Sequence, residues 1–306
     1  MGGKENRSFL EIDFTNLMDL RVDYAFKLVF GSGETVFLIS LLNAIFASKK
    51  IPRAVKSVEV LNPYLEKRSK EDKHSILDIK ARLEDGSVIL IEMHLYGMLD
   101  LKYKTLRSWA RVYGEELKPG EKYSAQPPVI CVAFADGSFE SDGRRKIHKC
   151  CKITDIDDGE VFTDALELHY IDMKAFAEAT NKAGGIEKGG AQGSMLANWL
   201  AFITEKDIAD KSIIKGICEE QEEIGMAVST LARFSEDKLT RHEYLRRQDD
   251  IMLAVKNELE YKMMERRAEQ ERARAEQERA RADAAETALD EKDAIIAMLK
   301  ARLGEK

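Results

Sequence analysis

Charged side chains alternate with apolar ones in two short runs of the chain, which are separated by Glu84-Asp85-Gly86. Asp78 and Lys80 alternate with aliphatic residues in the first run, and Glu92 and His94 do so in the second. A period of two is typical of β-strands with one buried face. Converging carboxylates can bind a divalent cation such as Mg²⁺, and a coordinated water can then attack a phosphodiester. These four side chains are the candidate catalytic residues.

The turn between the two runs determines which of these side chains meet. A three-residue loop with Gly86 in the left-handed region pairs Leu83 with Ser87 and places Asp78 directly opposite Glu92. A two-residue turn would instead move Glu92 to the apolar face, because a slip of one residue moves every side chain to the other face. The apolar pattern therefore predicts the three-residue loop.

Two carboxylates in directly opposed positions have Cβ atoms about 5 Å apart and repel each other. A divalent cation between Asp78 and Glu92 would replace this repulsion by shared coordination. Lys80 is then placed to orient or activate the water or to neutralise the transition state, and His94 could do part of this. An ordinary solvated sheet face with cross-strand ion pairs explains the same pattern without any catalysis, and this alternative stays open.

The surrounding sequence predicts the elements that position this hairpin. Apolar periodicity indicates helices over residues 23–30, 34–47 and 99–117. Strand-like runs cover residues 58–65, 75–83 and 88–96, and residues 128–135 suit a strand buried on both faces. Residues 167–173 read as another strand, and the glycine-rich residues 181–194 as a loop. The predicted order is α, three β, α, β, which makes a mixed α/β fold.

The helix predicted over residues 99–117 carries two stripes. The apolar one is expected to face the core. The basic one, Lys104, Arg107 and Arg111, could contact DNA phosphates independently of base sequence, although a solvated helix edge explains it equally. The residues of the apolar stripe, which are expected to face the core, are Tyr103, Leu106, Ala110, Tyr113 and Leu117. Elsewhere in the chain, a second basic cluster over residues 144–152 is interpreted as a surface loop.

The last part of the chain has the composition of a long helix. Residues 268–274 read AEQERAR, and residues 275–281 repeat this sequence. Leu289, Ile296 and Leu303 continue the seven-residue spacing, and no glycine or proline occurs between Gly225 and Gly304. This pattern predicts a coiled-coil tail through which the protein self-associates. A solitary charged helix is the alternative.

Composition narrows the functional classes. The chain has 306 residues, 44% of them hydrophobic and 34% charged, and a net charge of −7. It lacks the overall basic character of many nucleic-acid-binding proteins, although a local groove can still be basic. Its four cysteines have no CxxC spacing, so reduced thiols are expected. We found no apolar run of about 18 residues and no signal-peptide core, and therefore expect a cytoplasmic protein without a membrane span.

The hairpin and several further segments, in this order along residues 19–204, resemble the PD-(D/E)XK nuclease superfamily, and more narrowly its recombination-promoting nuclease (Rpn) and transposase family. The matching segments are Asp23-Tyr-Ala-Phe-Lys27 with Phe30-Gly31, Leu42-Asn43-Ala44, Leu61-Asn62-Pro63, Leu77-Asp78-Ile-Lys80-Ala81, Ile91-Glu92-Met93, Arg111-Val-Tyr113, Gly120-Glu-Lys-Tyr123 with Pro128-Val-Ile130, Leu166-Glu-Leu-His169 and Trp199-Leu-Ala-Phe202.

This resemblance implies a restriction-endonuclease-like α-β-β-β-α-β core, a mixed sheet flanked by helices. It assigns Asp78 and Glu92 to the metal-binding acidic pair, and Asp23 to an additional acidic position that could complete the metal shell. A helix N-cap is the alternative role of Asp23. The superfamily has Lys, and this family often Gln, where the chain has His94. This departure makes Lys80 the better candidate for the catalytic cation.

Taken together, these observations predict a nuclease-like domain over residues 1–210, a helical region over 211–255 and a coiled-coil tail over 256–306. The expected activity is Mg²⁺-dependent endonucleolytic hydrolysis of DNA in recombination or mobile-element transfer, by a homo-oligomer joined through the C-terminal helix. The alternative is an inactive nuclease fold that acts as a coiled-coil oligomerisation or interaction module.

Overall fold

The computed structural model describes residues 12–32, 34–61, 79–94, 101–137, 146–185, 190–302 and 304. The chain divides into two compact units, residues 1–248 and residues 249–306. The first unit contains the whole described β-sheet and all but the last part of the helical structure.

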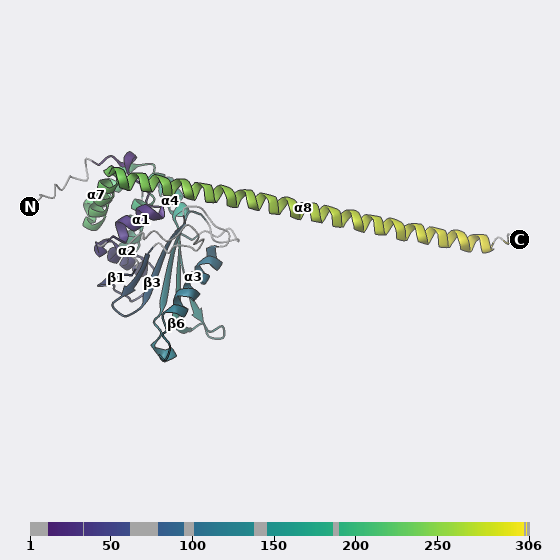
Figure 1. Ribbon diagram of the computed structural model, residues 1–306, viewed down its shortest axis with the longest axis horizontal. Coiled ribbons are helices and arrows are strands. Elements are labelled where there is room, and N and C mark those ends of the chain that lie inside the picture. Colours follow the sequence, from purple (N-terminus) through teal and green to yellow (C-terminus); the bar gives the residue numbers. More distant parts are fainter. Residues whose placement is uncertain are drawn as a thin grey trace, which may run out of the picture. The chain divides into compact units, whose positions relative to one another are not determined.

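The first unit is built on a mixed six-stranded sheet with the strand order β1-β2-β3-β4-β6-β5 (Figure 1). The pairs β1/β2, β2/β3 and β5/β6 are antiparallel, whereas β3/β4 and β4/β6 are parallel. Both β3 and β4 are buried along their whole length, as expected for central strands covered on two faces. The strands are β1 (Val58–Val60), β2 (Ile79–Leu83), β3 (Val88–His94), β4 (Val129–Ala135), β5 (His148–Thr154) and β6 (Val161–Asp172).

Helices cover both faces of this sheet. On one face, α3 (Leu101–Glu115) packs through Leu101 and Val112 against aliphatic residues of β3, β4 and β6. On the other face, α1 (Asp23–Phe30) and α2 (Thr35–Ser48) contribute a nearly continuous apolar surface, with α5 (Gly190–Ile203) packed behind them. Three ring contacts mark this packing: Phe26 with Phe134 at 5.8 Å, Phe46 with His169 at 5.7 Å and Phe30 with Trp199 at 5.5 Å.

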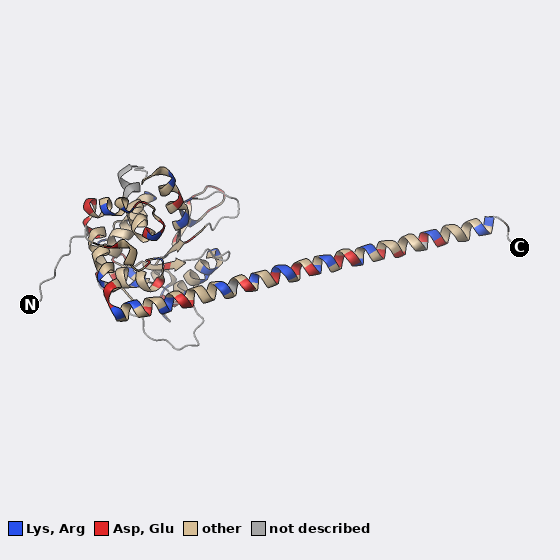
Figure 2. Ribbon diagram, turned by 90° about the horizontal axis from the view of Figure 1, so that it is seen from above, with Lys and Arg blue, Asp and Glu red and all other residues tan. Residues whose placement is uncertain are grey.

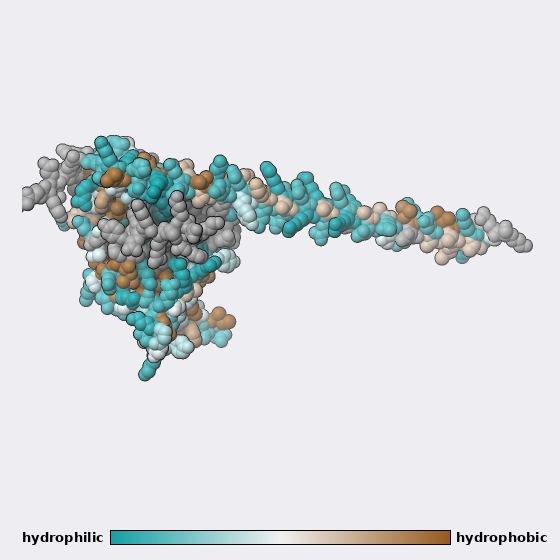
Figure 3. Space-filling view, viewed as in Figure 1, coloured by the Kyte–Doolittle hydropathy of each residue, from teal (hydrophilic) through white to brown (hydrophobic). Residues whose placement is uncertain are grey.

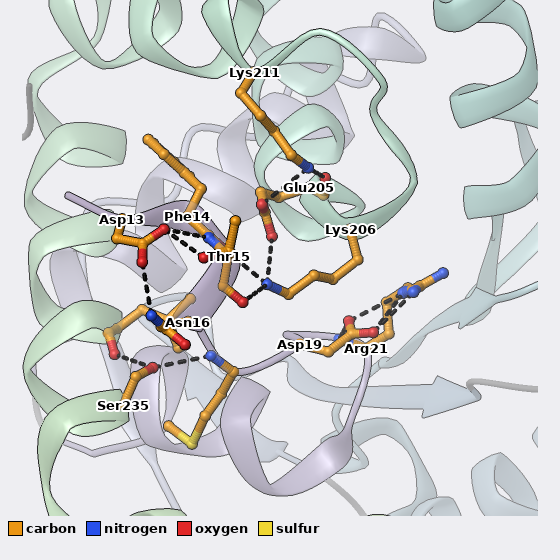
Figure 4. Close-up of polar contacts among 12 residues, drawn as sticks. Asp13, Phe14, Thr15, Asn16, Asp19, Arg21, Glu205, Lys206, Lys211 and Ser235 are labelled. Atoms are coloured by element: carbon orange, nitrogen blue, oxygen red, sulfur yellow. Dashed lines mark hydrogen bonds and ion pairs between the residues drawn. The ribbon is translucent and has the colours of Figure 1, made fainter.

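The segment that precedes α1 is held by polar contacts to helices from the second half of the first unit (Figure 4). Lys206 donates from Nζ to the backbone oxygen of Phe14 at 2.8 Å, and Ser235 accepts from the backbone nitrogen of Met18 at 2.9 Å. These contacts fix the start of α1. The remaining short elements are η2 (Phe14–Asn16), η3 (Tyr123–Ala125), α4 (Met173–Ala183), η4 (Glu205–Asp207), α6 (Lys211–Glu220) and α7 (Glu222–Glu236).

The last helix, α8 (Lys238–Arg302), is continuous over 65 residues. Its first turns belong to the first unit, where Tyr244 accepts from the backbone nitrogen of Asp19 at 3.0 Å and Arg241 donates to the backbone oxygen of Asn16 at 2.6 Å. The part in the second unit carries charges of both signs along its length (Figure 2). Its surface is mainly hydrophilic, and apolar side chains gather toward the C-terminal end (Figure 3).

This architecture confirms the predicted α/β restriction-endonuclease-like class and corrects two local predictions. The basic cluster near residue 148 was interpreted as a surface loop, but residues 148–154 form the edge strand β5, and His148 is buried. The loop expected over residues 181–194 is too long, because α4 continues to Ala183 and α5 begins at Gly190. Glycine at a helix start lowers helix propensity without preventing the helix.

Across the described part of the chain, no single helix has both the length and the apolar composition that crossing a bilayer requires, and α1 and α2 meet that test only together, across a bend of 106°.

Candidate active site

The β2–β3 hairpin has the predicted register. Gly86 has a φ of +85°, Leu83 donates to the backbone oxygen of Ser87 at 2.9 Å, and Ile79 pairs with Ile91. Gly86 adopts this left-handed conformation without strain because it has no Cβ. The three-residue loop is thereby confirmed. Asp78 lies outside the described residues, so its position opposite Glu92 stays a prediction.

The face of the hairpin that carries Glu92 and His94 is not a solvated sheet face. Glu92 is 4% exposed and His94 is 7% exposed, and Leu90 and Val88 of the same face belong to the apolar core under α3. A charged group buried to this degree requires hydrogen-bond partners. The alternative of an ordinary solvated face is therefore excluded for Glu92 and His94.

Both carboxylate oxygens of Glu92 have partners. Ser108 of α3 donates from Oγ to Oε1 at 2.8 Å, and His94 Nε2 lies 3.3 Å from Oε2. Burial raises the pKa of Glu92, but the hydrogen bonds from His94 and Ser108 and the charge of Lys104 outweigh burial, so the pKa lies below its usual value. Glu92 is accordingly an ionised, oriented carboxylate at neutral pH.

Lys80 of the hairpin and Lys104 of α3 have different surroundings. Lys104 Nζ lies 3.5 Å from His94 Nδ1. Lys80 Nζ lies 2.8 Å from Oε1 of Glu116, whose other oxygen accepts from Arg82 at 2.7 Å. Burial raises the pKa of Glu116, but the hydrogen bonds from Lys80 and Arg82 outweigh it and lower the pKa overall. Glu116 thus ties β2 to the end of α3.

The helix α3 presents a different face to the sheet than its apolar residues predict. Tyr103 is 74% exposed and Leu106 is exposed too, while Thr105 and Ser108 are buried. The prediction of a core-facing stripe through Tyr103 and Leu106 was wrong because the sheet beneath α3 offers the polar side chain of Glu92 as well as an apolar surface. Ser108 and Glu116 are the site residues that sequence reasoning missed. Neither has a distinctive sequence signal.

Two of the three proposed DNA-contacting residues lie on the outer side of α3, whereas Lys104 lies toward His94. Arg107 and Arg111 are exposed, and Lys104 is half-buried. Exposure leaves both guanidinium groups accessible to phosphate. Their role in DNA binding stays a prediction.

Asp23 is the first residue of α1, one position after the N-cap Val22. The N-cap alternative was therefore wrong by one residue, although a carboxylate in the first turn still favours the helix dipole. Arg247 of α8 donates from Nε to both carboxylate oxygens of Asp23 at 2.8 Å. A metal-binding role for Asp23 would require it to exchange this partner, and that role stays a prediction.

A second buried polar chain lies on the opposite face of the sheet. Ser48 Oγ is 2.8 Å from His148 Nδ1, His148 Nε2 is 2.9 Å from His169 Nδ1, and His169 Nε2 is 2.8 Å from Glu167 Oε1. Arg53 also donates to Glu167 at 3.1 Å. Two neutral imidazoles and one carboxylate supply a matching donor and acceptor for each of these contacts. The four residues therefore form a structural hydrogen-bond network.

Burial and neighbouring charges together determine the pKa values in this network. Burial lowers the pKa of His148 to about 2, with His169 and Lys49 acting in the same direction. It also lowers the pKa of His169, partly offset by Glu167. For Glu167, burial is outweighed by His169, Arg53 and Lys152, which lower the pKa to about 2. Both histidines are therefore neutral and Glu167 is ionised at neutral pH.

Among the residues that the structure describes, no group of three or more His, Cys, Asp or Glu side chains is arranged to hold a metal ion. The described residues nevertheless supply one fitting ligand, because Glu92 is ionised and oriented beside β2, the strand that directly follows Asp78. Carboxylate oxygens of this kind suit Mg²⁺.

The family model of the PD-(D/E)XK nuclease family transposases matches residues 20–261. This match covers well over half of the chain and includes the whole described sheet. The chain belongs to the PD-(D/E)XK nuclease transposase family. No curated protein and no solved structure matches it. Glu92 lies on β3, the strand after the hairpin turn, where the resemblance expected the second acid. The family resemblance inferred from the sequence is confirmed.

Proposed function

We propose that this protein is a metal-dependent endonuclease that hydrolyses DNA phosphodiester bonds in recombination or mobile-element transfer within the cytoplasm. The observation that carries the proposal is Glu92, a carboxylate that is buried, ionised and held by two donors, in a chain of the PD-(D/E)XK nuclease transposase family. A structural role alone does not require an ionised group in this position, since burying a charge costs free energy.

In this proposal Asp78 and Glu92 hold Mg²⁺ or another divalent cation, and Asp23 is the further acidic ligand. A bound divalent ion makes coordinated water a better nucleophile and stabilises charge on the phosphate. His94 belongs to the catalytic set because it contacts Glu92 at 3.3 Å. Two lysines are candidates for the catalytic cation of this site: Lys80 from β2 and Lys104 from α3.

DNA would lie along α3, where Arg107 and Arg111 on the outer side and Lys104 beside His94 meet phosphates. Such contacts are independent of base sequence and weaken as the salt concentration rises. The exposure of Arg107 and Arg111 supports this placement.

Self-association through α8 would pair two nuclease domains and allow cleavage of both strands. Leu289, Ile296 and Leu299 are exposed on this helix at spacings of a heptad seam. Exposed apolar side chains on a long helix favour a second copy as partner.

The test is nicking of a supercoiled plasmid with Mg²⁺ or Mn²⁺ by the full-length protein. The Glu92→Gln and Asp78→Asn variants should each lose cleavage by at least about 100-fold, whereas Glu115→Gln, an exposed carboxylate of α3, should cleave like the wild type. If neither variant changes the cleavage rate, the site assignment is wrong.

An inactive nuclease fold acting as an oligomeric interaction module is the second candidate function. The replacement of the superfamily lysine by His94 favours it. Absence of wild-type cleavage with every divalent metal, together with a stable oligomer in sedimentation, would support this candidate over the first.

A further inference from the structure

The helix α3 brings two polar side chains to the buried end of the hairpin face. Lys104 and Ser108 lie about one turn apart on the same side of the helix. Ser108 donates to Oε1 of Glu92 at 2.8 Å, and Lys104 reaches Nδ1 of His94 at 3.5 Å. One face of α3 therefore contacts both of the candidate catalytic residues on β3.

The chemistry of lysine sets which ring nitrogen of His94 accepts and which donates. An ammonium group can only donate, so a contact with Lys104 requires His94 Nδ1 to be the acceptor. The donor is then Nε2, which faces Oε2 of Glu92 at 3.3 Å. A single tautomer satisfies both contacts, and in this tautomer His94 donates to the carboxylate.

Lys80 is held in a different place. Its ammonium contacts Glu116 at 2.8 Å, at the C-terminal end of α3. This end lies roughly two turns, or about 12 Å, along the helix from Ser108. Arg82 shares the same carboxylate at 2.7 Å, so these three charges form a brace between β2 and α3.

We propose that α3 supplies the cation of the active site: Lys104 is the positioning residue that holds His94 as a donor to Glu92, and Lys80 braces the hairpin against the helix. The proposal rests on the nuclease function proposed above. In it, the ammonium that the superfamily places on the strand at position 94 comes from the neighbouring helix. His94 then orients the carboxylate instead of accepting a proton from water.

The first test compares full-length variants in single-turnover plasmid cleavage at saturating DNA, with Mg²⁺ or Mn²⁺. Lys104→Met should lower the cleavage rate by about 100-fold, the usual effect of removing one preorganised polar group. Lys104→Arg should recover most of this loss. Lys80→Met should lose much less cleavage than Lys104→Met but melt at a lower temperature than the wild type, since it removes a partner of Glu116. Lys102→Met, an exposed lysine of the same helix, is the matched control.

A second cleavage comparison separates positioning from phosphate binding. In a His94→Lys background, the additional Lys104→Met substitution should hardly change the cleavage rate, because the strand then carries its own ammonium. Affinity for a DNA duplex in EDTA should change much less than the cleavage rate in Lys104→Met. A variant that lost affinity alone would assign Lys104 to DNA binding and overturn the proposal.

A readout that does not depend on activity is the ¹⁵N spectrum of the five histidines, with His94 assigned from its absence in His94→Gln. The wild type should have an unprotonated Nδ1 and a protonated Nε2 at His94, and Lys104→Met should change both signals whereas Lys80→Met should not. Unchanged His94 signals in Lys104→Met would refute the inference even in a protein that never cleaves DNA. Missing wild-type cleavage with the expected spectra would refute the nuclease function alone.

Discussion

Mild acid should destabilise the first unit by protonating histidines of the buried hydrogen-bond network that links Ser48, His148, His169 and Glu167. In the folded protein His148 and His169 are buried and neutral, whereas in the unfolded chain both ionise with pKa values near 6.5. Lowering the pH below that value therefore protonates the unfolded state in preference to the folded one. By linkage, stability must fall as the pH falls.

The size of this effect follows from the pKa of His148. Burial lowers this pKa from 6.5 to about 2, so the folded state takes up almost no proton at this site between pH 7 and pH 5. Integrating the proton uptake of the unfolded chain over that interval gives a loss of about 2 kcal/mol in the free energy of unfolding. His169 adds a loss of the same sign.

Glu167 contributes outside this interval. Its pKa is lowered from 4.5 to about 2, so its stabilisation is present above pH 4.5 and is lost only below that value. Measurements between pH 7 and pH 5 therefore isolate the histidines from this carboxylate.

The assay is urea unfolding of the full-length protein at pH 7, 6 and 5, with the free energy of unfolding taken from the transition of the first unit. His148→Gln cannot titrate in this range and should lose about 2 kcal/mol less than the wild type between pH 7 and pH 5. His242→Gln, which replaces an exposed histidine of α8, is the control. Equal losses in the wild type and His148→Gln would refute the reasoning.

Three further predictions test the hairpin, the helix above it and the tail. Gly86→Ala should cost about 1–2 kcal/mol, because alanine is strained at a φ of +85° although no atom blocks its Cβ, and a melting temperature equal to the wild type would contradict the loop assignment. Ser108→Ala should lower the free energy of unfolding by about 1–3 kcal/mol, because it leaves Oε1 of Glu92 without its donor. Urea unfolding measures this loss, and Ser124→Ala, at an exposed position, should not show it. Ile296→Glu with Leu299→Glu should dissociate the full-length oligomer in sedimentation velocity if α8 pairs with a second copy, and an unchanged sedimentation coefficient would exclude this seam.

The hairpin was predictable from the sequence because its determinants are local. A period of two assigns each side chain to one face, and a single glycine with a positive φ sets the loop length. Together these fix the pairing of Ile79 with Ile91 and the direction of Glu92. The uniformly apolar run of β4 was predictable for the same reason, since a strand buried on both faces has no polar positions.

The partners of the hairpin were not predictable, because they come from a helix whose orientation depends on the sheet. Apolar content favours Tyr103 and Leu106 for the inner face of α3, yet Thr105 and Ser108 occupy it. A buried carboxylate gains more from a hydroxyl donor than from an aliphatic contact. A sequence pattern records the polarity of each residue but not the polarity of the surface it meets.

The edge strand β5 escaped prediction for a related reason. Its lysines suggest a solvated loop, but His148 faces inward and finds His169 and Ser48 at hydrogen-bond distance. Neither partner is near His148 in sequence. Only His148 of this strand is fully buried, and buried and exposed positions do not alternate along it, so a period of two gave no signal for a strand.

The two ends of α3 bear on how the proposed site could work with His94 in place of the superfamily lysine. Glu116 binds Lys80 and Arg82 of β2 at one end, and Lys104 reaches His94 of β3 toward the other. Polar contacts at both ends fix the position of α3 along the hairpin, since a shift by one turn would break both sets of contacts. In the proposed site, Lys104 of this helix supplies the cation that the superfamily places on the strand, which leaves the strand position to His94.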